Sequence, residues 1–157
     1  MFGPLCPIVS LWKSKWSACG AFPAWRDFDF LDFEGWWGHL SLGELQRDPF
    51  DLCWVLWGSR LVEWWGREYT NQLISKQPYL GKTWEQSERP YLQELRDKRL
   101  IGFVSGTLAP QQREYHHVHG VDLPLEQNGV VTHIFSAYKL KDGPEVFAPS
   151  APSVFTS

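Results

Sequence analysis

The sequence predicts an α+β fold in which a five-stranded antiparallel sheet is interrupted, after its second strand, by short helices. Three observations support this fold class: two strand-like segments come first, a stretch with helix-capping and helix-stopping residues follows, and three more strand-like segments come last. No internal repeat or low-complexity block breaks this order. The 157 residues are enough for one domain with its own core.

Composition narrows the classes of function. The formal net charge is -3 and the 15 Lys and Arg residues form no run, which argues against nucleic-acid binding. Three widely spaced cysteines without a C-x-x-C favour a reducing cytoplasm over a disulfide framework or a zinc knuckle. Lys13 and Lys15 interrupt the apolar start of the chain, so we expect neither a signal peptide nor a membrane anchor.

Aromatic residues are unusually frequent. Ten Trp, ten Phe and five Tyr make up 16% of the chain. Side chains of this kind either form a very aromatic core or line a cavity or an interface with flat, rigid surfaces. The sequence does not divide the aromatic residues among these roles.

The N-terminal segment, residues 1–22, is expected to form an amphipathic flanking helix. Pro7 suits a first helical turn, and the chain breaks the helix at Gly20 and Pro23. The apolar residues fall at helical spacing on one side of this helix; they are Ile8, Leu11, Trp12 and Trp16.

An acidic and aromatic segment, WRDFDFLDFEGWW, comes next. Its carboxylates are candidate ligands of a hard metal ion, because such ions prefer oxygen ligands. Acidic residues at the start of short helices act mostly as caps, and capping is the interpretation that we favour. The residues concerned are Asp27, Asp29, Asp32 and Glu34.

The first two strands are expected to form an antiparallel hairpin. Residues 39–45 alternate as a strand, residues 47–49 form the turn, and residues 50–57 are apolar on nearly every position, as in a strand that is covered on both faces. Simple alternation puts Trp54 and Leu56 on one face and Trp57 on the other.

Helical signals fill the connection to the third strand. Ser59 is expected to cap a short helix over residues 60–65, which Gly66 ends. A capping box follows at residues 83–86, and a second helix is expected from Pro90 to about Arg99. Its inward side chains would be Tyr91, Leu92 and Leu95.

Three further strands are expected at residues 100–108, 113–123 and 130–140. Asn128 and Gly129 are a strong hairpin signal between the last two. Residues 141–157 are poor in periodic apolar positions and are expected to be a flexible tail.

The stretch GSRLVEWWGREYT after the second strand resembles the signature of small bacterial PAS-type sensor domains. The similarity runs from about Leu11 to Leu140, and Asn71 departs from it because related sequences tend to have Gly there. Asn tolerates left-handed geometry, so the turn is expected to survive. Other similar positions are Pro23, Asp27, Asp29, Asp51, Gly58, Arg60, Val62, Gly66, Arg67, Thr70, residues 123–125 and residues 128–129.

The resemblance implies a PAS-like domain over residues 23–140, with the helices between strands two and three forming one wall of a pocket. We expect this pocket to be lined by Trp54, Leu56, Trp64, Trp65 and Phe103. The two adjacent tryptophans and Arg60 would hold a flat or anionic small molecule. In the alternative interpretation the tryptophans only fill the core, and Arg60 pairs with a nearby carboxylate.

The histidines are the sharpest polar feature of the sequence. On one strand His117 and His119 would point the same way, and His133 on the neighbouring strand could join them around a metal or haem. The interpretation that we favour is a set of imidazoles on one sheet face, because no Cys or carboxylate completes a ligand set. We expect no stable metal site, but an influence on ligand affinity near neutral pH.

The function expected from the resemblance is a sensory or interaction module that binds a small ligand or a signalling partner and has no catalytic activity. No nucleophile elbow and no phosphate-binding loop appears in the sequence. The alternative is a small cone-shaped α+β enzyme or carrier that uses the histidines and acidic residues in a pocket. No cofactor is identified, and a homodimer is expected through Ile8, Leu11, Trp12 and Trp16.

Overall fold

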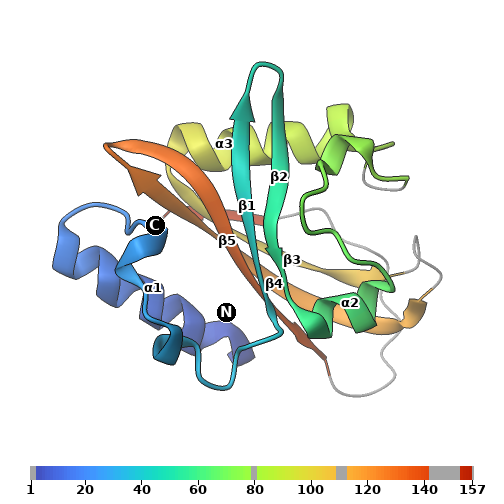
Figure 1. The fold of residues 1–157 in the computed structure, drawn as a ribbon, viewed down its shortest axis with the longest axis horizontal. Coiled ribbons are helices and arrows are strands. Elements are labelled where there is room, and N and C mark those ends of the chain that lie inside the picture. The colour runs from blue at the N-terminus through green and yellow to red at the C-terminus, as the bar shows by residue number, and fades with distance from the viewer. Residues whose placement is uncertain (1–2, 79–80, 109–112, 142–152, 157) are drawn as a thin grey trace.

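An antiparallel sheet of six strands forms the centre of the molecule (Figure 1). The computed structural model describes residues 3–78, 81–108, 113–141 and 153–156. The strands lie in the order β2-β1-β5-β4-β3-β6 and every neighbouring pair is antiparallel. The strands are β1 (Leu40–Arg47), β2 (Phe50–Trp57), β3 (Leu100–Leu108), β4 (Arg113–Gln127), β5 (Val130–Leu140) and β6 (Ser153–Thr156). The α+β class and its five-stranded antiparallel sheet, β1 to β5, are confirmed.

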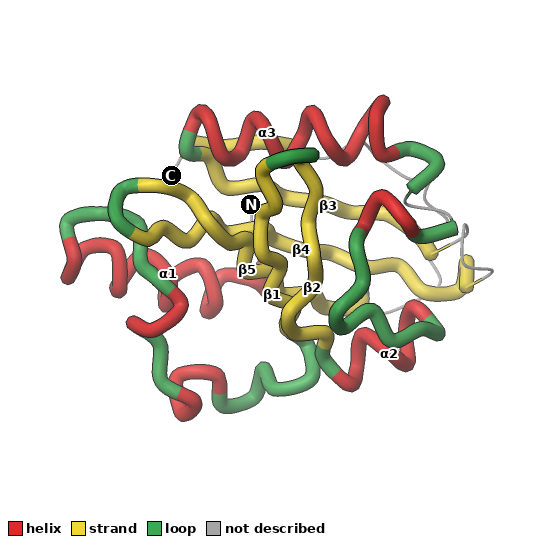
Figure 2. The backbone as a smooth tube through the Cα atoms, turned by 45° about the horizontal axis from the view of Figure 1, so that its top comes forward, coloured by secondary structure: helices red, strands yellow, loops and turns green. Residues whose placement is uncertain are grey.

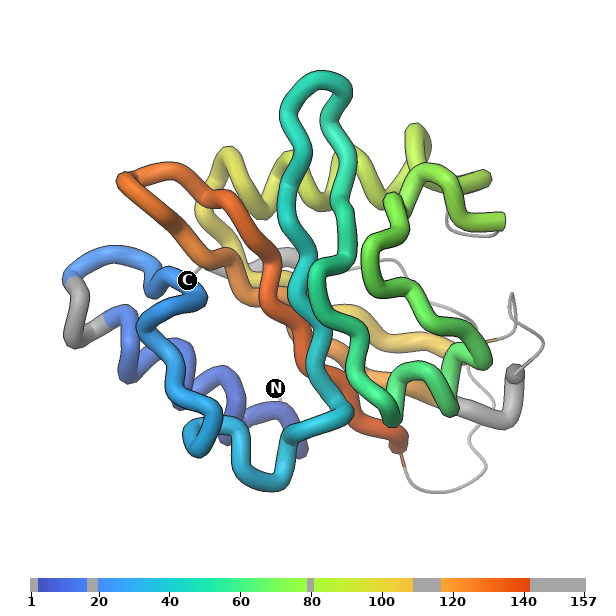
Figure 3. The backbone as a smooth tube through the Cα atoms, in the orientation of Figure 1, coloured from blue at the N-terminus to red at the C-terminus, as the bar shows by residue number. Residues whose placement is uncertain are grey.

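The helical connection lies where the sequence predicts it. Figure 3 follows the chain from the β1–β2 hairpin into α2 (Ser59–Trp65) and then through α3 (Arg89–Lys98) back to β3. Short helical turns also occur at Gly3–Leu5, Trp25–Asp27, Phe30–Phe33, Ile74–Lys76 and Trp84–Glu88. The β4–β5 hairpin has positive φ at Asn128 and Gly129, as a two-residue primed turn requires.

Helix α1 (Cys6–Cys19) covers one face of the sheet, which we call the outer face. Figure 2 shows α1 and α3 on opposite sides of the strands. Ile8 and Trp12 are fully buried within the chain, and the Trp12 Nε1 donates a hydrogen bond to the Pro124 carbonyl at 3.0 Å. Ile8 and Trp12 are therefore covered by the chain's own sheet and are not exposed to a second subunit, as the expected homodimer interface would need. Leu11 and Trp16 are only half-buried.

The other sheet face, the cavity face, is shaped by a β-bulge in the first hairpin. Gly43 pairs with Trp54, but Leu42 pairs with Leu56 and Ser41 with Trp57, so Val55 is the extra residue. A bulge reverses the alternation of the residues beyond it. The expected faces of β2 were therefore wrong: Trp57 shares the cavity face with Trp54, and Leu56 turns to the opposite side.

Two expected helix caps differ in the structure. Gly58, not Ser59, is the N-cap of α2, and Ser59 is the first helical residue. The predicted capping box at residues 83–86 is replaced by a π-helical turn, in which the Glu88 amide donates to the Thr83 carbonyl at 3.3 Å. The Thr83 hydroxyl donates to Glu88 Oε1 at 2.7 Å. This wider turn leads directly into α3.

Two other sequence predictions concern the acidic segment before β1 and the C-terminal residues. The carboxylates of Asp27 and Asp32 accept backbone amide hydrogens at 2.8 and 2.7 Å, the capping role favoured from the sequence. Residues Ser153–Thr156, expected to belong to a flexible tail, form β6 on the free edge of β3, while residues 142–152 lie outside the described part. Among the described residues, no helix has the length and apolar character needed to cross a membrane.

Candidate functional site

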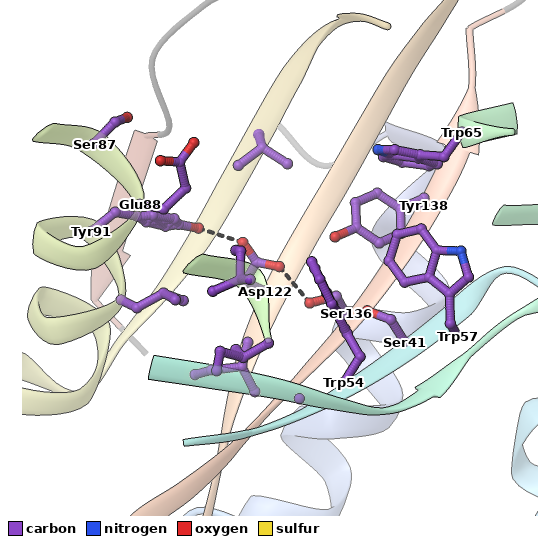
Figure 4. Close-up of a pocket in the computed structure, with 16 residues that line it drawn as sticks. Ser41, Trp54, Trp57, Trp65, Ser87, Glu88, Tyr91, Asp122, Ser136 and Tyr138 are labelled. Carbon is purple, nitrogen blue, oxygen red and sulfur yellow. Dashed lines mark hydrogen bonds between the residues drawn. The ribbon is translucent and has the colours of Figure 1, made fainter. Parts of the chain in front are cut away.

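A cavity of about 350 Å³ lies between the cavity face of the sheet and the helices α2 and α3 (Figure 4). Its volume is within the lower range of small-molecule sites. Strand residues supply its floor and the helical connection supplies its rim. The lining residues are Ser41, Gly43, Leu52, Trp54, Trp57, Trp65, Ile74, Ser87, Glu88, Tyr91, Leu92, Val104, Asp122, Ile134, Ser136 and Tyr138.

One wall of the cavity is a chain of aromatic rings from β2, α2 and β5. The ring centroids of Trp54 and Trp57 are 5.3 Å apart, those of Trp57 and Trp65 are 5.2 Å apart, and those of Trp65 and Tyr138 are 5.1 Å apart. Successive rings meet at steep angles of 66°, 80° and 69°, so faces and edges alternate. Such a wall offers ring faces to a flat or cationic ligand.

The polar centre of the cavity is Asp122, a buried carboxylate on β4. Its Oδ2 accepts a hydrogen bond from the Tyr91 hydroxyl at 2.6 Å, and its Oδ1 accepts one from the Ser136 hydroxyl. Figure 4 shows this line running from Tyr91 on α3, through Asp122, to Ser136 on β5. The Tyr138 hydroxyl lies on the same side of the cavity as Ser136 and Ser41 (Figure 4). Side chains from β4, β5 and α3 thus form one polar network.

A glycine allows Tyr91 to reach this carboxylate. Gly102 on β3 is the cross-strand partner of Asp122. A Cβ at Gly102 would lie 1.8 Å from the Tyr91 hydroxyl oxygen, far inside contact distance. Gly120 plays the same part for Tyr138, whose ring would lie 2.6 Å from a Cβ at that position. The absence of two side chains on β3 and β4 therefore makes room for the two tyrosines.

Burial sets the protonation of the network. It raises the pKa of Asp122, although the hydrogen bonds from Ser136 and Tyr91 act in the opposite direction. Burial and the nearby Asp122 carboxylate raise the pKa of Tyr91 and of Tyr138. Both phenols therefore stay protonated at physiological pH. Burial favours the neutral form of Asp122, whereas hydrogen-bond donors beside it favour the charged form.

A second carboxylate lies on the helical side of the cavity. Glu88, at the junction of the π-helical turn and α3, has its Oε1 hydrogen-bonded to Thr83, while its Oε2 is buried and has no hydrogen-bond partner. Figure 4 shows Glu88 beside Tyr91. None of the described residues that line the cavity is Lys, Arg or His. The cavity therefore combines two carboxylates with an aromatic wall.

Two of the nine residues expected to bind a ligand line the cavity, and the other seven do not. Trp54 and Trp65 line it. Arg60 is exposed and forms an ion pair with Glu63 at 3.2 Å, the alternative kept open for it. Trp64 is buried against the His39 ring, with centroids 5.3 Å apart. Leu56 is exposed and borders a separate hollow near Phe30 and Trp37.

The outer face, away from the cavity, carries Phe103, His117, His119 and His133. Phe103 and His119 are stacked, and His117 and His119 both contact the Ser105 hydroxyl at 3.0 Å. His133 pairs with Leu125, whereas His119 pairs with Lys139, so His133 is well along the sheet from the other two. In the described part of the chain, no group of three or more His, Cys, Asp or Glu residues is arranged to hold a metal ion.

Sequence reasoning missed most of the polar network. It placed Tyr91 inward, but it did not single out Asp122, Ser136, Tyr138 or Trp57. The available signal for Asp122 was its position between Val121 and Leu123 in an apolar strand, because a carboxylate there must be buried or the strand must be at an edge. The spacing of Glu85 and Glu88, three residues apart, is typical of a solvent-facing pair on a helix and gives no sign that Glu88 lies in a cavity.

Comparison of the chain with family models, with curated proteins and with solved structures gives no match.

Proposed function

We propose that this chain is a PAS-like sensory module that binds a small ligand in the cavity and passes its bound state to a partner, without catalytic activity of its own. The observation that carries the proposal is the cavity of about 350 Å³, walled by aromatic rings and centred on a buried carboxylate. Mostly apolar walls with a few convergent polar groups are typical of ligand sites. The five-stranded antiparallel sheet with helices between β2 and β3 is compatible with the resemblance seen in the sequence.

The elements around the cavity also suggest how binding would be transmitted. Trp65 ends α2, and Glu88 and Tyr91 begin α3, so a ligand in the cavity would touch both helices and the sheet together. A ligand changes a conformational equilibrium only when it binds one state better than the other. Contact with two separate helices would give the ligand different affinities for two arrangements of these helices. The alternative enzyme or carrier loses its main support, since His117, His119 and His133 do not line the cavity.

Native mass spectrometry of freshly purified protein tests the proposal. We expect a noncovalently bound small molecule on the wild-type chain, released on denaturation. Val104→Phe should abolish this binding because Val104 lines the cavity and the larger ring would fill it, whereas Val55→Phe, at an exposed position on β2, should not. Loss of the small molecule from neither variant, or from both equally, would contradict the proposal.

A further inference from the structure

The chemistry of the cavity indicates the class of its ligand. Two of its lining residues, Asp122 and Glu88, carry carboxylates, and the described lining contains no cationic side chain. An anionic ligand would face like charge in a poorly solvated space, where repulsion is strong. The anionic ligand expected beside Arg60 is therefore disfavoured, because Arg60 is exposed and paired with Glu63.

Glu88 presents an unused acceptor. Its Oε2 is buried without a hydrogen-bond partner, and leaving such an oxygen unpaired is destabilising unless something donates to it. The other oxygen, Oε1, already accepts from Thr83 at 2.7 Å, which fixes the carboxylate at the helical side of the cavity. A ligand with a strong hydrogen-bond donor would complete this group.

Asp122 adds a second acceptor in the middle of the cavity. Each of its oxygens accepts one hydrogen bond, from Tyr91 or Ser136, and a carboxylate oxygen has a second lone pair available. The aromatic wall of Trp54, Trp57 and Trp65 completes the environment, since ring faces attract cations as well as apolar groups.

We infer that the cavity selects a primary or substituted amine in its protonated form, with the ammonium group at Glu88 and Asp122 and an aromatic or aliphatic body against Trp54, Trp57 and Trp65. This inference rests on the proposed function, because it names the ligand class of the same cavity. An ammonium supplies up to three donors and no acceptor, which matches the carboxylate oxygens of Glu88 and Asp122, because these accept hydrogen bonds.

Calorimetric titration with three probes of the same skeleton tests the inference. Phenethylamine is cationic, 2-phenylethanol is neutral and 3-phenylpropionate is anionic. We expect phenethylamine to bind at least about tenfold more tightly than either of the others, since hydrogen bonds between charged groups are the stronger ones. Val104→Phe should abolish binding of the amine.

Glu88→Gln separates charge recognition from cavity binding. This substitution should weaken phenethylamine about tenfold or more and leave 2-phenylethanol unchanged, because only the amine uses the charge. The matched control is Glu85→Gln, one helical turn earlier, whose exposed carboxylate pairs with Arg89 at 2.9 Å outside the cavity. It should leave all three affinities unchanged.

The contrary outcomes distinguish this inference from the function on which it rests. If 3-phenylpropionate binds as tightly as the amine and Val104→Phe abolishes both, the cavity binds ligands but does not select cations, and the inference is wrong. If no binding of phenethylamine is detected at about 10 mM, the cavity does not recognise the amine, and the inference is also wrong. If, in addition, native mass spectrometry finds no bound molecule, the proposed function fails with it.

Discussion

The Tyr91 hydroxyl donates a 2.6 Å hydrogen bond to Asp122 directly above Gly102, the strand residue paired with Asp122. This one contact ties α3 to the middle of the sheet. It also fixes the carboxylate at the centre of the cavity. Both residues are buried, so neither oxygen can exchange its partner for bulk water without moving the helix.

Removing the Tyr91 hydroxyl should therefore be costly. Tyr91→Phe leaves Asp122 Oδ2 without its donor, and we expect the free energy of unfolding to fall by about 1–3 kcal/mol. Ser136→Ala removes the donor to Oδ1 and should have a similar effect. Urea unfolding of both single variants and the double variant measures the coupling. Strictly additive losses would contradict a shared network around one carboxylate.

Gly102→Ala should break the same contact by crowding. The added Cβ would lie 1.8 Å from the Tyr91 hydroxyl oxygen, so the ring must move away from Asp122. We expect a loss of about 1–3 kcal/mol, within the range measured for overpacked cores. In the Tyr91→Phe background the clash with the hydroxyl is gone, so Gly102→Ala should be less harmful there. An equal loss in both backgrounds would show that the crowding lies elsewhere.

The raised pKa of Asp122 predicts a specific pH dependence. Between the ordinary value of 3.8 and the raised folded value, the folded chain keeps a proton on Asp122 that the unfolded chain has lost. The stability from this proton is complete below pH 3.8 and is lost as the pH rises through the folded pKa. Relative to Asp122→Asn, the wild type should therefore become less stable with rising pH. A difference that is constant or grows with pH would contradict the assignment.

Trp12 tests whether α1 serves its own sheet or a second subunit. Trp12 is fully buried and bonded to the Pro124 carbonyl. We expect Trp12→Ala to lower the free energy of unfolding by about 3–5 kcal/mol, independent of protein concentration. Ser10→Ala, at an exposed position on the same helix, is the matched control and should have little effect. A concentration-dependent transition that Trp12→Ala abolishes would instead indicate a dimer.

Local signals in the sequence predicted the elements well, because each signal acts over a few residues. Asn128 and Gly129 adopt the positive φ values of a tight hairpin, and Gly66 ends α2 with left-handed geometry. Asn71 has a φ of 66°, the left-handed geometry that Asn tolerates. Tyr91 is buried, as the helical spacing around Pro90 predicted.

The cavity was harder to predict because it depends on register and on distant contacts. The bulge at Val55 moves Trp57 to the cavity face, and nothing in the apolar run of β2 marks an extra residue. The contact between Tyr91 and Asp122 joins residues 31 positions apart, and it depends on the small size of Gly102. The histidines drew attention by their spacing, but alternation along β4 puts His117 and His119 on the face opposite Asp122.

The most direct test of the ligand cavity is the set of tryptophan indole N–H resonances during titration with phenethylamine. We expect saturable shifts for Trp54, Trp57 and Trp65, which line the cavity, and no shift for Trp12 and Trp36, which do not. The same pattern should disappear in Val104→Phe. Unchanged resonances for the three cavity tryptophans would contradict binding of the amine in the cavity, and equal shifts at Trp12 and Trp36 would contradict a site between the sheet and helices α2 and α3.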